Sequence, residues 1–223
     1  DPISGDFAHG EVRFRVVDTA GIRRRSRVTE NVEYYSVNRA IRSLEEADVV
    51  LLIVDAEEGL AEQDKKIAAL AADRGRGLVI VLNKWDRMER GRGAVRAATE
   101  RVRFLFPVLQ FAPVVAISAQ NGWNVDRLLK VVLEVWAQLR RKVPTHLLNR
   151  LLRQWLAAYP LPVRGRNVKL RYATQTGVNP VRFVFFVNNR KGYPGGYTRY
   201  LENRIREDLG FDKIPVAVEI RES

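Results

Sequence analysis

GLVIVLNKWD, residues 77–86, is the stretch that decides the fold, because six mostly apolar residues run directly into four that are largely polar. A continuous apolar run of this length is typical of a strand covered on both faces of a parallel sheet. The tetrapeptide Asn83-Lys84-Trp85-Asp86 then falls at the carboxyl end of that strand, where open α/β sheets bind their ligands. Taken alone, the same tetrapeptide also fits an ordinary turn.

The side chains of this tetrapeptide suit the recognition of guanine. The Asp86 carboxylate can accept hydrogen bonds from both the N1–H and the N2 amino group of guanine, whereas adenine offers no such pair of donors. We expect Lys84 to lay its alkyl stem along the base and sugar, and Asn83 to tie the loop to its neighbours while donating toward the base. Discrimination against adenine should be large, because the carboxylate would otherwise be buried without donors.

Further strands and helices are expected on both sides of this stretch. Residues 12–17 alternate apolar and charged side chains, as a half-buried strand does, whereas 48–55 and 113–117 are continuous apolar runs of strands covered on both faces. The alternation of strands and helices predicts an α/β domain with a doubly wound, mostly parallel sheet. Apolar residues at helical spacing predict the helices at 32–46, 62–74, 93–106 and 124–142.

A second, smaller domain is expected after Val143, because Pro144 breaks the helical pattern and a new helix starts at Thr145. We place the two domains at 1–143 and 144–223. The second contains a predicted helix, a hairpin, another helix and a last strand, which is the order α-β-β-α-β and predicts a small α+β domain with helices on one face of its sheet. The predicted strands are 167–174, 181–188 and 216–220, and the second helix is predicted at 197–209.

Two more loops complete a set of three strand ends in the order that a GTPase requires. Asp18 follows the strand at 12–17 and can hold Mg²⁺ through a water molecule, because hard dications take oxygen ligands and keep part of their hydration shell. Gly21 has no side chain, so its backbone N–H can approach a γ-phosphate oxygen. In the third loop, the Ala119 N–H can donate to guanine O6 while the Ser118 hydroxyl braces the loop of Asp86.

At these residues the chain resembles the translation-factor-related GTPases, which keep such motifs where this sequence has DTAG (18–21), NKWD (83–86) and SAQ (118–120). The longer stretches DTAGIRRRSRV, SVNRAIRSLEEADVVLLIVDAEEGLAEQD and LVIVLNKWD, followed by a small basic domain, resemble the second GTPase domain and the KH-like domain of the Der/EngA family. These are bacterial proteins with tandem GTPase domains that act in assembly of the large (50S) ribosomal subunit. The resemblance covers essentially the whole chain.

The resemblance implies a P-loop-GTPase-type fold, hydrolysis of GTP to GDP, Mg²⁺ as cofactor, and the large ribosomal subunit or its rRNA as partner. The residues that it places at the nucleotide are Asp18, Thr19, Ala20, Gly21, Ile22, Asn83, Lys84, Trp85, Asp86, Ser118, Ala119 and Gln120.

Three departures from the family pattern limit what this chain does by itself. It contains no G-x-x-x-x-G-K-[ST], the loop that cradles the β-phosphate, and it starts at Asp1 without an initiator methionine. We therefore expect a larger protein whose N-terminal part, with its first GTPase domain, is missing here, and we expect this fragment alone to bind nucleotide poorly and to be inactive. Ile22 stands where some GTPases have a glutamine that orients water, so no catalytic residue is assigned.

The second domain carries most of the positive charge. Residues 144–223 hold 14 basic and 6 acidic side chains, which is +8 of the net +12 of the whole chain. Such a surface binds RNA or DNA through counterion release, or it only keeps the protein solvated. Alternatively, part of it docks on the missing GTPase domain. Gly192-Tyr193-Pro194-Gly195 fits both the G-x-x-G loop with which KH domains clamp a nucleic-acid backbone and a simple turn. The candidate RNA-binding residues are Arg164, Arg166, Lys169, Arg171, Arg190, Lys191, Gly192, Gly195 and Arg199.

Composition excludes several classes of protein. The chain has no cysteine, so it has neither disulfides nor a thiolate metal site, and it has no apolar run of the ~18 residues needed to cross a bilayer. We expect a cytoplasmic protein with no membrane contact. Two functions remain in competition: a GTPase whose nucleotide state repositions the KH-like domain, and a non-catalytic RNA-binding module that uses the nucleotide-binding fold only as a scaffold.

Overall fold

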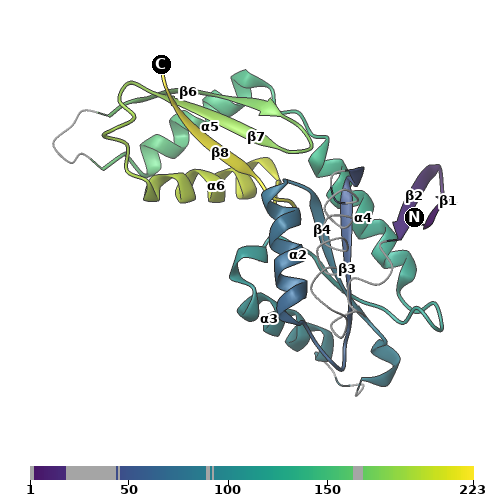
Figure 1. The fold of residues 1–223 in the computed structure, drawn as a ribbon. Helices are drawn as coiled ribbons and strands as arrows, with labels where there is room; N and C mark the ends of the chain where they lie inside the picture. Colours follow the sequence, from purple (N-terminus) through teal and green to yellow (C-terminus); the bar gives the residue numbers. More distant parts are fainter. Residues whose placement is uncertain (1–2, 19–43, 45, 89–90, 92, 163–167) are drawn as a thin grey trace, which may run out of the picture. The chain divides into compact units, whose positions relative to one another are not determined.

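The computed structural model describes residues 3–18, 44, 46–88, 91, 93–162 and 168–223 (Figure 1). The chain divides into two compact units, Asp1–Leu133 and Glu134–Ser223. The division falls within helix α4 (Val125–Leu139). The domain boundary that we place at residue 143 stays a prediction.

A three-stranded parallel sheet forms the centre of the first unit. Its strands are β3 (Val49–Asp55), β4 (Gly77–Asn83) and β5 (Val114–Ala116), in the order β3-β4-β5. Helix α2 (Glu62–Asp73) connects the first two strands, and α3 (Ala94–Leu105) lies between the last two. The predicted alternation of strand and helix is therefore confirmed in this part of the chain.

Burial differs sharply between the central strand and its neighbour. In β4 every residue from Gly77 to Leu82 is buried, as its continuous apolar run predicts. One face of β4 packs in the core with small residues of α2, among them Ala68 and Ala71. In β3 only alternate residues are buried, and Ile53 is 54% exposed. The prediction that residues 48–55 are covered on both faces is wrong for the described part of the chain, because Leu51 and Ile53 on one face of β3 are 38% and 54% exposed.

Residues 3–9 form a strand that was not predicted from the sequence. This strand, β1 (Ile3–His9), pairs antiparallel with β2 (Val12–Asp18) in a separate two-stranded sheet. Gly10 adopts φ +61 in the tight turn between them, a conformation that suits glycine. The prediction that residues 12–17 form a strand of the doubly wound sheet is therefore corrected: β2 is paired with its neighbour in sequence and not with β3.

Most of the helix predicted at 32–46 lies outside the described residues. Of its C-terminal end the structure describes Leu44 and Glu46, which are both helical, and Leu44 is buried in the core of the first unit.

The second unit has the predicted order α-β-β-α-β. Its elements are α5 (Thr145–Ala158), β6 (Leu170–Gly177), β7 (Arg182–Val187), α6 (Gly196–Leu209) and β8 (Ala217–Glu222). Strands β6 and β7 form the predicted antiparallel hairpin, and β8 adds parallel to β7.

The two helices of this unit cover one face of its sheet, as predicted. Phe183 and Phe185 of β7 are fully buried on that face, together with Leu148 of α5 and Leu201 of α6. The Asn149 side chain fixes α5 to β6, because it both donates to the carbonyl of Ala173 (2.8 Å) and accepts from its N–H (2.9 Å). The residues that alternate with the buried phenylalanines point to the opposite, outer face of the sheet.

The difference in burial between β4 and β3 predicts two different costs for one substitution. Ile80→Ala should lower the free energy of unfolding by about 2–5 kcal/mol, because Ile80 is fully buried and its removal leaves a cavity. Ile53→Ala is the matched control on the adjacent strand and should cost about 1 kcal/mol or less. Urea unfolding followed by circular dichroism measures both losses, and equal losses would contradict the difference in burial between Ile80 and Ile53.

Candidate nucleotide-binding site

The loops after β4 and β5 are joined by one side chain. The Asn83 Oδ1 atom accepts a hydrogen bond from the Lys84 N–H (2.8 Å) and another from the Ala119 N–H (3.0 Å). Backbone bonds continue beside it, since the N–H of Ile117 donates to Leu82 O (2.9 Å) and that of Trp85 donates to Ile117 O (3.1 Å). The structure thus brings together two of the three predicted loops, NKWD and SAQ, and Asn83 ties them as expected.

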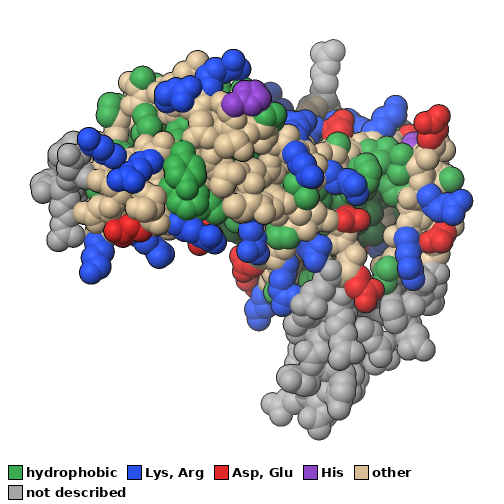
Figure 2. All heavy atoms as spheres, turned by 90° about the horizontal axis from the view of Figure 1, so that it is seen from above, with side chains coloured by type: hydrophobic (Ala, Val, Ile, Leu, Met, Phe, Trp, Pro, Cys, Tyr) green, Lys and Arg blue, Asp and Glu red, His purple; other side chains and the backbone are tan. Residues whose placement is uncertain are grey.

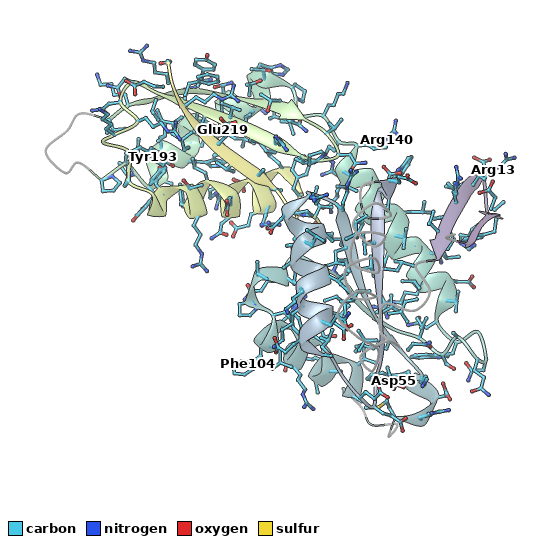
Figure 3. All side chains as sticks on the ribbon, in the orientation of Figure 1. Arg13, Asp55, Phe104, Arg140, Tyr193 and Glu219 are labelled. Atoms are coloured by element: carbon cyan, nitrogen blue, oxygen red, sulfur yellow. The ribbon has the colours of Figure 1, made fainter. Side chains whose placement is uncertain are left out.

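Lys84 is held by a carboxylate that the sequence analysis did not single out. Its Nζ lies 2.5 Å from Oδ2 of Asp55, which ends β3 and stands opposite Asn83 in the parallel register (Figure 3). The other oxygen of Asp55 accepts the Glu57 N–H at 3.0 Å. The hydrogen bond from Lys84, supported by the one from Glu57, lowers the pKa of Asp55 from its ordinary value. The sequence could have pointed to Asp55 by its place at the end of a strand, which it shares with Asp18 and Asn83.

The backbone of the NKWD loop turns sharply at Lys84, which has the left-handed values φ 61 and ψ 33. A short 3-10 helix, η1 (Trp85–Arg87), follows and carries Asp86, whose side chain is half-buried. The Trp85 ring is only 8% exposed and belongs to the hydrophobic core of the unit. Trp85 therefore anchors the loop to the core.

The SAQ loop differs from the prediction in two contacts. The Ser118 hydroxyl is buried but has no hydrogen-bond partner among the described residues, so the expected brace to the loop of Asp86 is not formed. Instead, the Ser118 N–H donates to Trp123 O (3.1 Å), which closes the loop on itself. The Ala119 N–H, expected to donate to guanine O6, donates to Asn83 in this structure. Ala119 and Gln120 are both exposed.

Helix α4 is attached to the same end of β5. Asn124 directly precedes the helix, and its side-chain amide donates to Ala116 O at 2.6 Å. Asn124 has a φ of 63, which is unusual for a residue other than glycine and fits its place in this tight loop. The start of α4 is therefore fixed to the strand that positions the SAQ loop.

The loop expected to hold Mg²⁺ and the γ-phosphate lies almost entirely outside the described residues. Asp18 ends β2, and the structure describes its backbone but not its side chain. Thr19, Ala20, Gly21 and Ile22 all fall in the undescribed segment 19–43. Among the residues that are described, no three His, Asp or Glu side chains are grouped to bind a metal ion. The roles of Asp18 to Ile22 stay predictions.

The candidate RNA-binding residues of the second unit fall into two groups. Arg164 and Arg166 lie outside the described residues. The loop of Gly192 and Gly195 directly precedes α6, as predicted, and follows the end of β7. Its N–H groups are partly used within the loop, because Gly192 donates to Asn189 Oδ1 at 3.1 Å. The five candidate side chains that the structure describes are all exposed: Lys169, Arg171, Arg190, Lys191 and Arg199.

Two known protein families match separate parts of the chain. Residues 9–138 match the elongation factor Tu GTP binding domain, which is more than half of the chain. The chain belongs to this family of GTP-binding domains. Residues 142–221 match the KH-domain-like C-terminal region of EngA bacterial GTPase enzymes.

Relatives called GTPase Der confirm the resemblance to the Der/EngA family. The protein from Treponema pallidum is 43% identical over 223 residues, which is 100% of this chain and 48% of the relative. The protein from Borrelia garinii subsp. bavariensis is 45% identical over 209 residues, which is 94% of this chain and 47% of the relative. The chain therefore spans about half the length of the curated relatives it matches.

Two solved structures of Era resemble the fold of nearly the whole chain. Era in complex with MgGDPNP and nucleotides 1506–1542 of 16S ribosomal RNA has a TM-score of 0.52 and 23% identity over 99% of this chain and 80% of that chain. An Aquifex aeolicus Era variant bound to GDP and AlF4⁻ has a TM-score of 0.51 and 22% identity, with the same coverage. At these identities the likeness shows the fold, and it confirms the predicted fold class.

The contact between Lys84 and Asp55 predicts how one carboxyl group titrates. Because the folded-state pKa of Asp55 is lowered, its stabilising effect is complete above the unfolded value of about 4 and is lost as the pH falls through the folded value. Lys84→Met should raise the pKa of Asp55, which carboxyl ¹³C NMR can measure. Lys66→Met, which changes an exposed lysine of α2, should leave it unchanged. An identical titration in wild type and Lys84→Met would disprove the pairing.

Proposed function

We propose that the intact protein binds GTP and hydrolyses it to GDP, with this chain supplying the base-recognition loops. The observation that carries this proposal is the joining of the NKWD and SAQ loops through Asn83, which holds Asp86 at the carboxyl ends of parallel strands. The names of the Der relatives and the match to a GTP-binding domain support it.

In this proposal Asp86 accepts the N1–H and N2 amino protons of guanine, and that pair of bonds excludes adenine. Lys84 lays its stem along the base and sugar, and Asp55 holds its ammonium group at the far end. The Ala119 N–H then exchanges its bond to Asn83 for one to guanine O6, or shares itself between the two oxygens. Each step uses a group whose place is fixed by the ends of β3, β4 or β5.

Mg²⁺, when bound with the nucleotide, neutralises charge on the phosphate oxygens. Asp18 ends strand β2, and a carboxylate is a suitable ligand for a hard dication held through water. The proposed phosphate contacts of Thr19 to Ile22 are backbone contacts, with Gly21 nearest to the γ-phosphate. We assign no catalytic residue, because Ile22 is apolar and cannot orient water by hydrogen bonding.

A further GTPase domain is part of the proposal. No G-x-x-x-x-G-K-[ST] occurs in the 223 residues, and the Der relatives are about twice as long as the matched region. We infer that the phosphate-binding loop and an N-terminal GTPase domain belong to the same protein and that the present chain alone is inactive.

We further propose that the protein acts in assembly of the large ribosomal subunit in the bacterial cytoplasm, and that its KH-like unit contacts rRNA. The net charge of +8 in residues 144–223 supports a polyanionic partner. Era, whose fold is similar, is described in complex with a fragment of 16S ribosomal RNA. No helix within the described ranges is long and apolar enough to span a bilayer.

The base-recognition role of Asp86 predicts a change of nucleotide preference. In the intact protein, Asp86→Asn should weaken GTP by roughly 100-fold or more, because one acceptor of a bidentate pair becomes a donor. The same variant should bind xanthosine triphosphate better than wild type does, because the amide donates to O2 of xanthine. Calorimetry measures both affinities. Asp73→Asn is the control, because Asp73 is an exposed carboxylate at the C-terminal end of α2. It should change neither the affinity for GTP nor that for xanthosine triphosphate. GTP turnover that survives Asp86→Asn unchanged would rule out the site assigned here, whereas an intact protein without GTP turnover would leave the non-catalytic RNA-binding module.

The rRNA contact predicts a strong dependence on salt. The affinity of the chain for single-stranded RNA should fall with added KCl, with a log–log slope of about −0.7 for each phosphate contact. Replacing Arg190 by Gln should reduce the slope by about one contact. Fluorescence anisotropy at several salt concentrations gives the slope, and binding that does not depend on salt would favour docking on the GTPase domain instead.

A further inference from the structure

The outer face of the β6-β7-β8 sheet carries a pair of stacked aromatic rings. Tyr172 of β6 and Phe186 of β7 are directly opposite each other in the register. Their ring centroids lie 4.3 Å apart and their planes differ by 12°. Tyr172 is 44% exposed, so part of the stack faces solvent. The helices cover the other face of this sheet, where Phe183 and Phe185 are fully buried.

Two arginines share this face of the sheet with the aromatic pair. Arg221 of β8 is opposite Phe186, and Arg182 lies two rows along the sheet, opposite Ala217. Glu219 of β8, labelled in Figure 3, accepts two hydrogen bonds from Arg221, at 2.8 and 2.9 Å. The hydrogen bond from Arg221 lowers the pKa of Glu219, and the charges of Arg190 and Arg182 lower it further. Arg182 and Arg221 are both exposed, so their guanidinium groups reach solvent.

Stability of the hairpin accounts for only part of this arrangement. A cross-strand aromatic pair stabilises two antiparallel strands, whatever charges surround it. Here the pair lies beside a group of arginines, and Figure 2 shows Lys and Arg side chains among hydrophobic ones on the surface of this unit. Exposed aromatic rings beside cations are the chemistry that binds unpaired bases, because every base has a π-face and every phosphate is an anion.

We propose that the outer face of the β6-β7-β8 sheet binds single-stranded RNA, with an unpaired base stacked on the Tyr172–Phe186 pair and phosphates held by Arg182 and Arg221. Duplex RNA does not fit this mode, because its bases are already stacked on one another. The inference deepens the rRNA contact proposed above and rests on it only for the kind of partner.

The glycine loop before α6 is a weaker candidate for the principal contact. Gly192 donates its N–H to Asn189 Oδ1, and the N–H of Tyr193 donates to Arg190 O at 3.1 Å. Two of the N–H groups that would clamp a phosphate are thus already used within the loop. The sheet face, in contrast, presents a ring surface and guanidinium groups that reach solvent.

Stacking is separated from charge by comparing two probes on the 223-residue chain. The probes are a fluorescein-labelled oligoadenylate decamer and an abasic decamer with the same number of phosphates, both measured by anisotropy at one fixed salt concentration. Wild type should bind the oligoadenylate more tightly. Tyr172→Leu should weaken the oligoadenylate by about 5- to 150-fold and leave the abasic probe nearly unchanged, because one base–aromatic stack is removed.

Two further variants keep the test decisive. Tyr172→Trp retains a stacking surface and should keep the preference for bases, which excludes a general effect of altering the hairpin. Phe104→Leu changes an aromatic residue of α3 that is 83% exposed and should change neither affinity. Thermal unfolding by circular dichroism verifies that each variant is folded.

The possible results distinguish this inference from the broader proposal. Equal losses for both probes in folded Tyr172→Leu, or no loss for either, would overturn the stacking role while leaving an rRNA contact through charge in place. A wild-type chain that binds neither probe would overturn the rRNA contact as well and leave this face for protein docking. The nucleotide specificity of the intact protein is measured independently and is unaffected by either outcome.

Discussion

The amide oxygen of Asn83 is the contact on which the candidate nucleotide site depends. It accepts the N–H of Lys84 and the N–H of Ala119, so two loops separated by 36 positions in the chain share one anchor. The parallel pairing of β4 with β5 prepares this contact, because it brings both strands to an end at the same edge. A carboxylate such as Asp86 discriminates between purines only at a fixed distance and orientation, and that anchor supplies both.

Strand pairing also determines which charge stands beside the base-recognition loop. Because β3 pairs with β4 in parallel register, Asp55 lies opposite Asn83 and within 2.5 Å of the Lys84 ammonium group. The ion pair spans 29 positions of sequence and holds the lysine stem across the strand ends. Burial also distinguishes the two strands, because Ile53 on one face of β3 is exposed while β4 is buried from Gly77 to Leu82.

The second unit uses a sheet in a different way. Both of its helices pack on one face, where Phe183 and Phe185 are buried, so the alternate residues of every strand are presented together on the other face. The candidate nucleotide site of the first unit is built from loops at strand ends, which suits a small ligand enclosed on several sides. The outer face of the second sheet carries the exposed side chains of Arg182 and Arg221 beside the stacked rings of Tyr172 and Phe186, which suits an extended polyanion.

The sequence by itself predicted most of the described elements, though not β1, and the chemistry of the central motif. Local periodicity predicted β4 and the helices, and the donor and acceptor pattern of NKWD pointed to guanine, because both depend on residues close together in the chain. Only the tertiary structure decided that β2 pairs with β1, that β3 is buried on one side, that Asp55 holds Lys84 and that Asn83 accepts from Ala119. Strand partners and side-chain contacts between distant residues depend on which strands lie side by side, and no local pattern specifies that.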